Sequence, residues 1–275
     1  MTSSANSMAE SLPGKILRRL RRLVVPREFR RIRDRLRDRR ALEVGGPSAV
    51  FKRWNLWPLY PVLGQVDQYN YAARTLWSGS DQTGQIIGEA AAMEGIASGT
   101  YSALLASHVL EHLANPLRAL DEWRRVVAAD GMIVLVVPHR DGTFDHRRPV
   151  TTLEHLVNDY KTGTGEEDTT HVAEILELHD FSRDPGAQSR AHFVDRARNN
   201  VQHRALHHHV FTTESLLTLL DYARFRILYV DVERPYHICA ICAADGEPSR
   251  NAAFWSPEVA WRSKDLFPSD RIARH

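Results

Sequence analysis

The sequence is poor in cysteine and in long apolar runs, and each shortage argues against a class of protein. Its two cysteines, Cys239 and Cys242, lie in the segment HICAICAA. Because they are three residues apart on an expected strand, their side chains point to opposite faces and are poorly placed to share one metal ion or one disulfide. We interpret both as small strand residues of the core.

No apolar run approaches the roughly 20 residues of a membrane-spanning helix. The N-terminus also lacks the continuous apolar segment that precedes the cleavage site of a secretory signal. We therefore expect a cytoplasmic protein. With 275 residues, 43% of them hydrophobic, the chain can bury one large core or a core and a smaller lobe.

Residues 101–140 have the pattern of a strand, a polar turn, a helix and a second strand. The runs 101–106 and 132–137 are apolar without alternation, which is typical of strands buried on both faces of a parallel sheet. Residues 116–127 between them have helical periodicity. Ligands of such sheets bind outside the carboxyl ends of the strands. Polar side chains occur at these ends: Ser107, His108 and Glu111 after the first strand, and His139 after the second.

An earlier apolar run ends in a glycine turn. Glu43 is followed by Gly45, Gly46 and Ser48, which favour a tight turn where the backbone can approach a ligand closely. The glycine spacing is not G-x-G-x-x-G, so a pyrophosphate site for a dinucleotide is poorly supported.

Two further expected strands carry an acid near their ends. Residues 64–71 include Asp67, which can accept hydrogen bonds from ribose hydroxyls, and residues 85–91 include Glu89. Each acid alone is a weak signal, because it can also cap a helix or face water. Their ordered recurrence along the chain is a stronger signal than any one of them.

The sequence resembles the class I S-adenosylmethionine-dependent methyltransferases of the type 11-like branch, through the ordered segments LEVGGPS, VD, GEAA and SALLASHVLEHLANPLRALDEWRRVVAADGMIVLVVP. The resemblance covers residues 41–140 and 211–243. It implies a Rossmann-like doubly wound α/β sheet, mostly parallel with an antiparallel edge hairpin. Two departures stand out: Pro47 and Ser48 replace the third glycine of the first motif, and Ser102 replaces a common aspartate.

The resemblance also implies which residues bind S-adenosylmethionine. Glu43, Gly45, Gly46 and the adjoining Ser48 would hold the methionine part, Asp67 the ribose, Glu89 and Ala90 the adenine, and Ser107 and His108 the region beside the sulfonium.

The insertion 141–210 is too long for a bare loop and is expected to form a helical lobe. It holds nine of the fourteen histidines and follows the end of the fifth strand, so it can cover the place where the methyl group is presented. We call it the acceptor lobe.

A hydroxyl acceptor must lose a proton, and histidine is the side chain best matched to that role near neutral pH. We predict His146 as the base, oriented by Asp145 or Asp141, with His139 as second choice. The alternative is that His146 is a structural histidine. Asp and His residues of the lobe could also hold Mg²⁺ beside a diol, but no spacing identifies ligands.

Two histidine patterns are open to a metal interpretation. His108 and His112 are four residues apart, but the glutamate adjoins the second histidine and no third ligand is evident, so we favour a cofactor-side turn over zinc. The run 207–209 is three consecutive histidines; if it is extended, at most two of them can face one site.

The first 40 residues are strongly basic, with thirteen Lys or Arg between residues 15 and 40 against three acids. Apolar residues form one helical stripe in 16–24 and a second at Phe29, Ile32 and Leu36. The stripes are expected to pack on the sheet or on a second subunit of a homo-oligomer. A contact with an anionic membrane surface is the alternative, and no nucleic-acid motif is present.

The expected organisation is a disordered and basic start (1–40), a cofactor-binding core (41–140), the acceptor lobe (141–210), a core completion (211–245) and a tail (246–275). Trp255 and Trp261 indicate that the tail docks on the body of the protein or on a neighbouring subunit. The run TFDHRRPVTTLEHL is similar to methyltransferases of polysaccharide assembly, so a sugar hydroxyl is the expected acceptor. The alternatives are a small metabolite, a lipid-linked intermediate at a membrane, or a cofactor-binding partner without activity.

Overall fold

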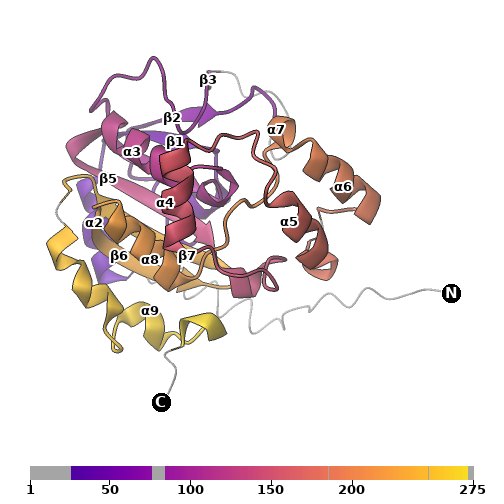
Figure 1. The fold of residues 1–275 in the computed structure, drawn as a ribbon. Coiled ribbons are helices and arrows are strands. Elements are labelled where there is room, and N and C mark those ends of the chain that lie inside the picture. Colours follow the sequence, from indigo (N-terminus) through magenta and orange to yellow (C-terminus); the bar gives the residue numbers. More distant parts are fainter. Residues whose placement is uncertain (1–25, 76–83, 185, 247, 272–275) are drawn as a thin grey trace.

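The computed structural model describes residues 26–75, 84–184, 186–246 and 248–271. At its centre lies a seven-stranded sheet with the order β3-β2-β1-β4-β5-β7-β6 (Figure 1). The strands are β1 (Arg40–Val44), β2 (Gln65–Asn70), β3 (Ile86–Ile87), β4 (Tyr101–Ser107), β5 (Val127–Pro138), β6 (Arg226–Glu233) and β7 (His237–Ala243). Neighbours from β3 to β5 are parallel, and β7 is antiparallel to both β5 and β6. The predicted class I methyltransferase fold is confirmed.

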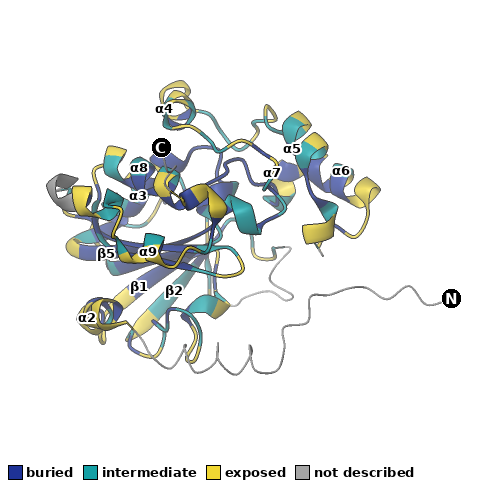
Figure 2. Ribbon diagram, turned by 90° about the horizontal axis from the view of Figure 1, so that it is seen from below, coloured by how far each residue is buried: buried dark blue, intermediate teal, exposed yellow. Residues whose placement is uncertain are grey.

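Helices cover both faces of the sheet. On one face, α3 (Pro116–Val126) and α8 (Thr213–Tyr222) bury Leu120, Trp123 and Leu216 against the strands. On the other, α2 (Arg27–Arg35) packs through Phe29 and Ile32, with Leu36 just beyond its end. Figure 2 shows the buried inner side and the exposed outer side of α2. The second N-terminal stripe therefore packs on the sheet, and the first stripe lies outside the described residues.

The two cysteines lie on β7 and are both buried and free. Cys239 packs among the residues on the α2 side, and Cys242 among those on the α3 and α8 side. The prediction that they point to opposite faces is confirmed.

The insertion after β5 contains α4 (Leu153–Thr162), α5 (Val172–Leu178), α6 (Arg190–Arg198) and α7 (Asn200–His203). α5 and α6 pack around a small apolar cluster of their own that includes Ile175, Phe193 and Leu206. α4 instead buries Leu156 in the core beside α3 and α8. In Figure 1, α5 and α6 stand to one side of the sheet.

The tail docks on the body of the protein, as predicted for Trp261. This residue lies in α9 (Ala260–Ser263), is 2% exposed and belongs to the main core. Beyond it, the buried Asp270 carboxylate accepts hydrogen bonds from the Thr213 backbone N–H (3.1 Å) and hydroxyl (2.5 Å) at the start of α8. None of the described helices is long and apolar enough to cross a membrane.

Replacing Asp270 with alanine is expected to lower the free energy of unfolding by about 1–3 kcal/mol, because it leaves the buried Thr213 donors without a partner. Urea unfolding measures this change. Asp265→Ala is the control, since this exposed carboxylate only pairs with Arg271 and its loss should have a much smaller effect. Equal effects of the two variants would contradict a docked tail.

Candidate cofactor and acceptor site

The turn after β1 is held by a buried carboxylate. Glu43 is fully buried and accepts hydrogen bonds from the Ser48 backbone N–H (2.9 Å), the Tyr60 hydroxyl (2.6 Å) and the Gln68 amide (3.2 Å). Burial raises the pKa of Glu43, although these hydrogen bonds oppose the shift. Glu43 and Ser48 therefore shape the turn rather than line the pocket beside it.

Other side chains approach both glycines of this turn so closely that neither position has room for a Cβ atom. Gly45 has a φ of +74°, and a Cβ atom on it would lie 2.5 Å from Val109 Cγ2. A Cβ atom on Gly46 would overlap the Glu43 carboxylate. The turn thus brings the end of β1 against the segment that follows β4.

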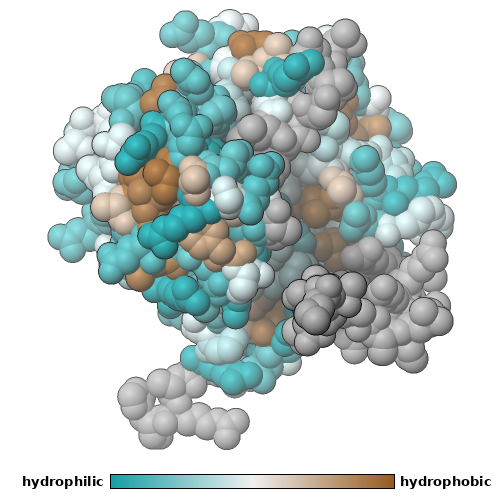
Figure 3. All heavy atoms as spheres, turned by 90° about the vertical axis from the view of Figure 1, so that its right-hand side faces the viewer, coloured by the Kyte–Doolittle hydropathy of each residue, from teal (hydrophilic) through white to brown (hydrophobic). Residues whose placement is uncertain are grey.

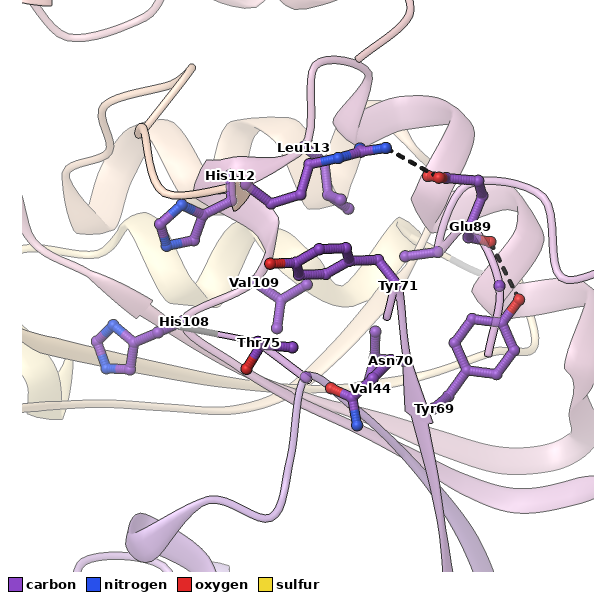
Figure 4. Close-up of a pocket in the computed structure, with 14 residues that line it drawn as sticks. Val44, Tyr69, Asn70, Tyr71, Thr75, Glu89, His108, Val109, His112 and Leu113 are labelled. Carbon is purple, nitrogen blue, oxygen red and sulfur yellow. Dashed lines mark hydrogen bonds and ion pairs between the residues drawn. The ribbon is translucent and has the colours of Figure 1, made fainter. Parts of the chain in front are cut away.

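A pocket lies beside this turn, at the carboxyl ends of β1, β2 and β4 (Figure 4). Four of the predicted cofactor residues line it, namely Gly45, Glu89, Ala90 and His108. Gly46 and Ser107 adjoin lining residues in the chain but do not line the pocket, and neither does Ser48. The remaining lining residues were not predicted: Val44, Tyr69, Asn70, Tyr71, Thr75, Gly88, Val109, His112, Leu113 and Arg204.

The prediction that Asp67 binds the ribose is wrong in this structure. Asp67 lies in the middle of β2, opposite Leu42, and its carboxylate is bound by Arg40 (3.0 Å to Nε), Gln65 (2.6 Å) and the Tyr101 hydroxyl (2.9 Å). These partners hold it near the amino ends of β1 and β4. The pocket is at the other ends.

Asn70 takes the place expected for the acid. It is the last residue of β2, lines the pocket, and donates hydrogen bonds to Gln85 Oε1 (2.8 Å) and Gly46 O (3.4 Å). The prediction placed Asp67 near the end of its strand, whereas β2 continues three residues beyond it to Asn70.

The acceptor lobe reaches one end of the pocket through Arg204. Its guanidinium pairs with Glu89 (2.9 Å) and Glu166 (2.6 Å) and lies over the Tyr71 ring (5.7 Å). The Tyr71 hydroxyl also donates to the carbonyl of His203 (2.8 Å). Glu89 therefore connects the core to the lobe as well as lining the pocket.

His108 and His112 lie at the opposite end of the pocket from Tyr69 and Glu89 (Figure 4). His108 Nε2 is 3.0 Å from His237 Nδ1. The ring of His112 donates from Nδ1 to the Leu206 carbonyl (2.9 Å), and burial lowers its pKa to about 4. His112 is therefore neutral at pH 7.

Between these two histidines lies Glu111, which is 1% exposed. Its Oε1 atom is 3.5 Å from His108 Nδ1 and 3.7 Å from His112 Nε2. The His112 ring also packs edge-on against His207 of the lobe, with ring centres 4.6 Å apart. A glutamate and histidines from core and lobe thus converge at this end of the pocket.

The structure pairs the predicted catalytic residues differently from the sequence prediction. Asp145 is buried and bonds His207 Nδ1 (2.5 Å) and Arg148 Nη1 (3.0 Å) instead of His146. His146 Nε2 pairs with Asp180 (2.8 Å). Hydrogen bonds from Ser182 and His146 hold the pKa of Asp180 below its usual range.

Asp141 and His139 are likewise committed to structural contacts. The Asp141 carboxylate accepts hydrogen bonds from Ser269 (2.6 and 2.7 Å) in the tail, so it does not orient His146. His139 is fully buried, stacks on Phe267 and contacts Asp270 through Nε2 (3.2 Å). Because no face of this ring is open to an acceptor, His139 does not fit the role of a base.

Gly45→Ala is expected to abolish measurable binding of S-adenosylmethionine, because the new methyl group would collide with Val109 and strain the turn. Isothermal titration calorimetry measures the binding. Gly95→Ala is a matched control: Gly95 has a φ of +82° but no atom within 4 Å of an added Cβ. A Gly45→Ala variant that binds as tightly as Gly95→Ala would exclude this turn from the cofactor site.

Comparison with known proteins gives one family match. Residues 59–135 match the family model described as a methyltransferase domain, and this segment spans β2 to β5. No curated protein matches the sequence.

Solved structures give more distant likenesses. A SAM-dependent methyltransferase from Aquifex aeolicus is 11% identical, with 80% of this chain and 90% of that chain covered and a TM-score of 0.41. The 1,6-didemethyltoxoflavin-N1-methyltransferase of Burkholderia thailandensis is 12% identical, with 88% and 92% covered and a TM-score of 0.42.

Because these TM-scores are low, we base the assignment on the family match, the strand order and the turn after β1. The family match identifies residues 59–135 as part of a methyltransferase domain, and the strand order is that of the class I methyltransferase fold.

Proposed function

We propose that the chain transfers a methyl group from S-adenosylmethionine to a hydroxyl group of a sugar or oligosaccharide. The cofactor supplies a methyl group that is already strongly electrophilic, so the protein mainly has to align donor and acceptor. Gly45, Asn70, Glu89 and Ala90 would hold the cofactor. Gly45 lines the pocket and has no side chain, so a ligand can approach its backbone closely.

The observation that carries the proposal is the Asp145–His207 pair beside the pocket. The carboxylate accepts the Nδ1 proton of His207, so Nε2 of the neutral ring has a free lone pair. The His112 and Phe144 rings, at 4.6 and 4.7 Å, hold the imidazole in place. His207 Nε2 is therefore the atom that would accept the hydroxyl proton during transfer.

We favour His207 over His146 because of its neighbours. His207 packs on His112, which lines the pocket, and lies near Glu111, a carboxylate that would stabilise the imidazolium. The hydrogen bond of the His146 ring is to Asp180, which caps a turn of the lobe. In the described part of the chain, no contact joins the His146 ring to a pocket-lining residue.

A polar acceptor is consistent with the surface of the lobe. The side of the molecule on which α5 and α6 lie is mostly hydrophilic, with separate apolar patches (Figure 3). Arg147 and Arg183 are half-exposed beside Asp180 and can hydrogen-bond hydroxyl groups. The sugar class itself comes from the resemblance of residues 143–156 to methyltransferases of polysaccharide assembly. Mg²⁺ stays a prediction.

A methyl-transfer assay tests the acceptor class. S-Adenosylmethionine labelled in its methyl group is supplied with monosaccharides and oligosaccharides, with amino sugars as nitrogen acceptors, and with Mg²⁺ or a chelator. The expected product is a methyl ether. Methylation of amines alone would contradict oxygen transfer, and cofactor binding without any product would favour a non-catalytic partner.

Substitution of the base gives a second test. His207→Gln is expected to lower kcat by roughly 10²- to 10⁴-fold, the usual contribution of a general base, while the Kd for S-adenosylmethionine stays unchanged. His146→Gln is the matched control, since this histidine on the same turn as Asp145 has its own aspartate. If His146→Gln lost turnover and His207→Gln kept it, the base would be His146.

A further inference from the structure

Three histidines of the acceptor lobe face one another outside the cofactor pocket. His155 is in the first turn of α4, His171 immediately precedes α5, and His209 follows α7 in the segment that leads back to the core. Their ring centres are 4.9, 5.6 and 5.8 Å apart. One nitrogen of each ring lies within 4.8 Å of the other two.

The protonation of His209 follows from its hydrogen bond. Nε2 is 3.2 Å from the Ala114 carbonyl, which can only accept, so the proton of the neutral ring is on Nε2. Nδ1 then carries a bare lone pair. This atom has no hydrogen-bond partner, although the residue is only 1% exposed. A buried acceptor left without a hydrogen-bond partner is unfavourable unless something binds it.

The Nε2 atoms of His155 and His171 have the spacing expected of two ligands of one metal ion. His155 Nε2 and His171 Nε2 are 3.2 Å apart. Zinc binds imidazole nitrogen at about 2.0–2.1 Å in a tetrahedron, which places two ligand nitrogens about 3.4 Å apart. We propose that His155, His171 and His209 bind a divalent transition-metal ion, with zinc as the best match to three imidazoles.

A carboxylate for a fourth position lies next to the three histidines. Asp159, one turn along α4 from His155, has its Oδ2 atom 3.1 Å from His155 Nε2, and this oxygen has no hydrogen-bond partner. Three imidazoles and a carboxylate favour zinc over Mg²⁺, which prefers oxygen ligands and water.

His208 is close to this group but is excluded as a ligand by its hydrogen bond. The Asn200 side-chain carbonyl accepts from the N–H groups of Ala205 and Leu206, so its NH₂ group points to His208 Nε2 (3.2 Å). The proton of a neutral His208 is therefore on Nδ1, which faces Asp168 at 4.0 Å. The structure thus assigns three histidines to the ion, with His208 beside them.

Such an ion would link three segments of the lobe to one another and stabilise the contact of the lobe with the core. It joins the start of α4 and the start of α5 to the segment 207–210, which also pairs with the core through the His209 N–H and the Glu111 carbonyl (3.2 Å). The same segment carries His207. The site is independent of the proposed function, because none of its three ligands lines the cofactor pocket.

Metal analysis tests the proposal without reference to activity. The full chain, produced without a polyhistidine tag, is loaded with Zn²⁺, dialysed and measured by plasma mass spectrometry. Equimolar zinc is expected, with loss of the ion in His209→Ala and His171→Gln. His192→Gln, an exposed histidine of the same lobe, should keep it. Zinc-free wild-type protein, or equal zinc in His209→Ala and His192→Gln, would overturn the proposal.

Two further measurements test the proposal. The first uses the wild-type protein, so it does not depend on how well a variant folds, and the second tests the group formed by Glu111, His112 and His207. Wild-type protein loaded with Co²⁺ should show the visible absorption of a tetrahedral site, and its absence would also overturn the proposal. His207→Gln should retain the ion, whereas loss of zinc in this variant would move the site to Glu111, His112 and His207. Protein that binds zinc but methylates no hydroxyl would retain this site and refute the proposed function.

Discussion

The structure of the cofactor site depends on the buried Glu43 carboxylate at the end of β1. A carboxylate without water is unfavourable unless hydrogen bonds replace its hydration. Glu43 receives three, from Ser48, Tyr60 and Gln68, and these partners come from the turn, the segment after it and β2. Its carboxylate therefore fixes the path of the glycine turn. That path brings Gly45 against Val109, so that the end of β1 and the segment after β4 line one pocket.

The acceptor lobe is coupled to this pocket at both ends. Arg204 joins Glu89 of the core to Glu166 of the lobe at one end, and His207 packs on His112 at the other. Arg204 and His207 are only three residues apart in sequence, so one short segment spans the pocket. A shift of this segment would alter the cofactor side and the acceptor side together. The two ends of the pocket are therefore coupled directly through this segment of the chain.

The sequence was informative where burial alone decides the structure. The unalternated apolar runs of β4 and β5 predicted a parallel sheet, and the glycine turn located the end of β1. It failed at Asp67 because the end of β2 is set by register with β1 and not by residue type. It also failed for the Asp–His pairs: Asp145 bonds a histidine 62 positions away, and His146 an aspartate 34 positions away. Adjacent residues looked like natural partners, but Asp145 and His146 have separate partners on distant segments.

The three consecutive histidines 207–209 have different hydrogen-bond partners, which their sequence does not reveal. The side chain of His207 bonds Asp145, and His208 faces Asn200. His209 faces the Ala114 carbonyl, His155 and His171. Each hydrogen bond fixes which nitrogen carries the proton, and hence which nitrogen is free. The free atom is Nε2 in His207 and Nδ1 in His209. Identical neighbouring residues thereby present different nitrogens as free acceptors, because the chain positions a different hydrogen-bond acceptor against each ring.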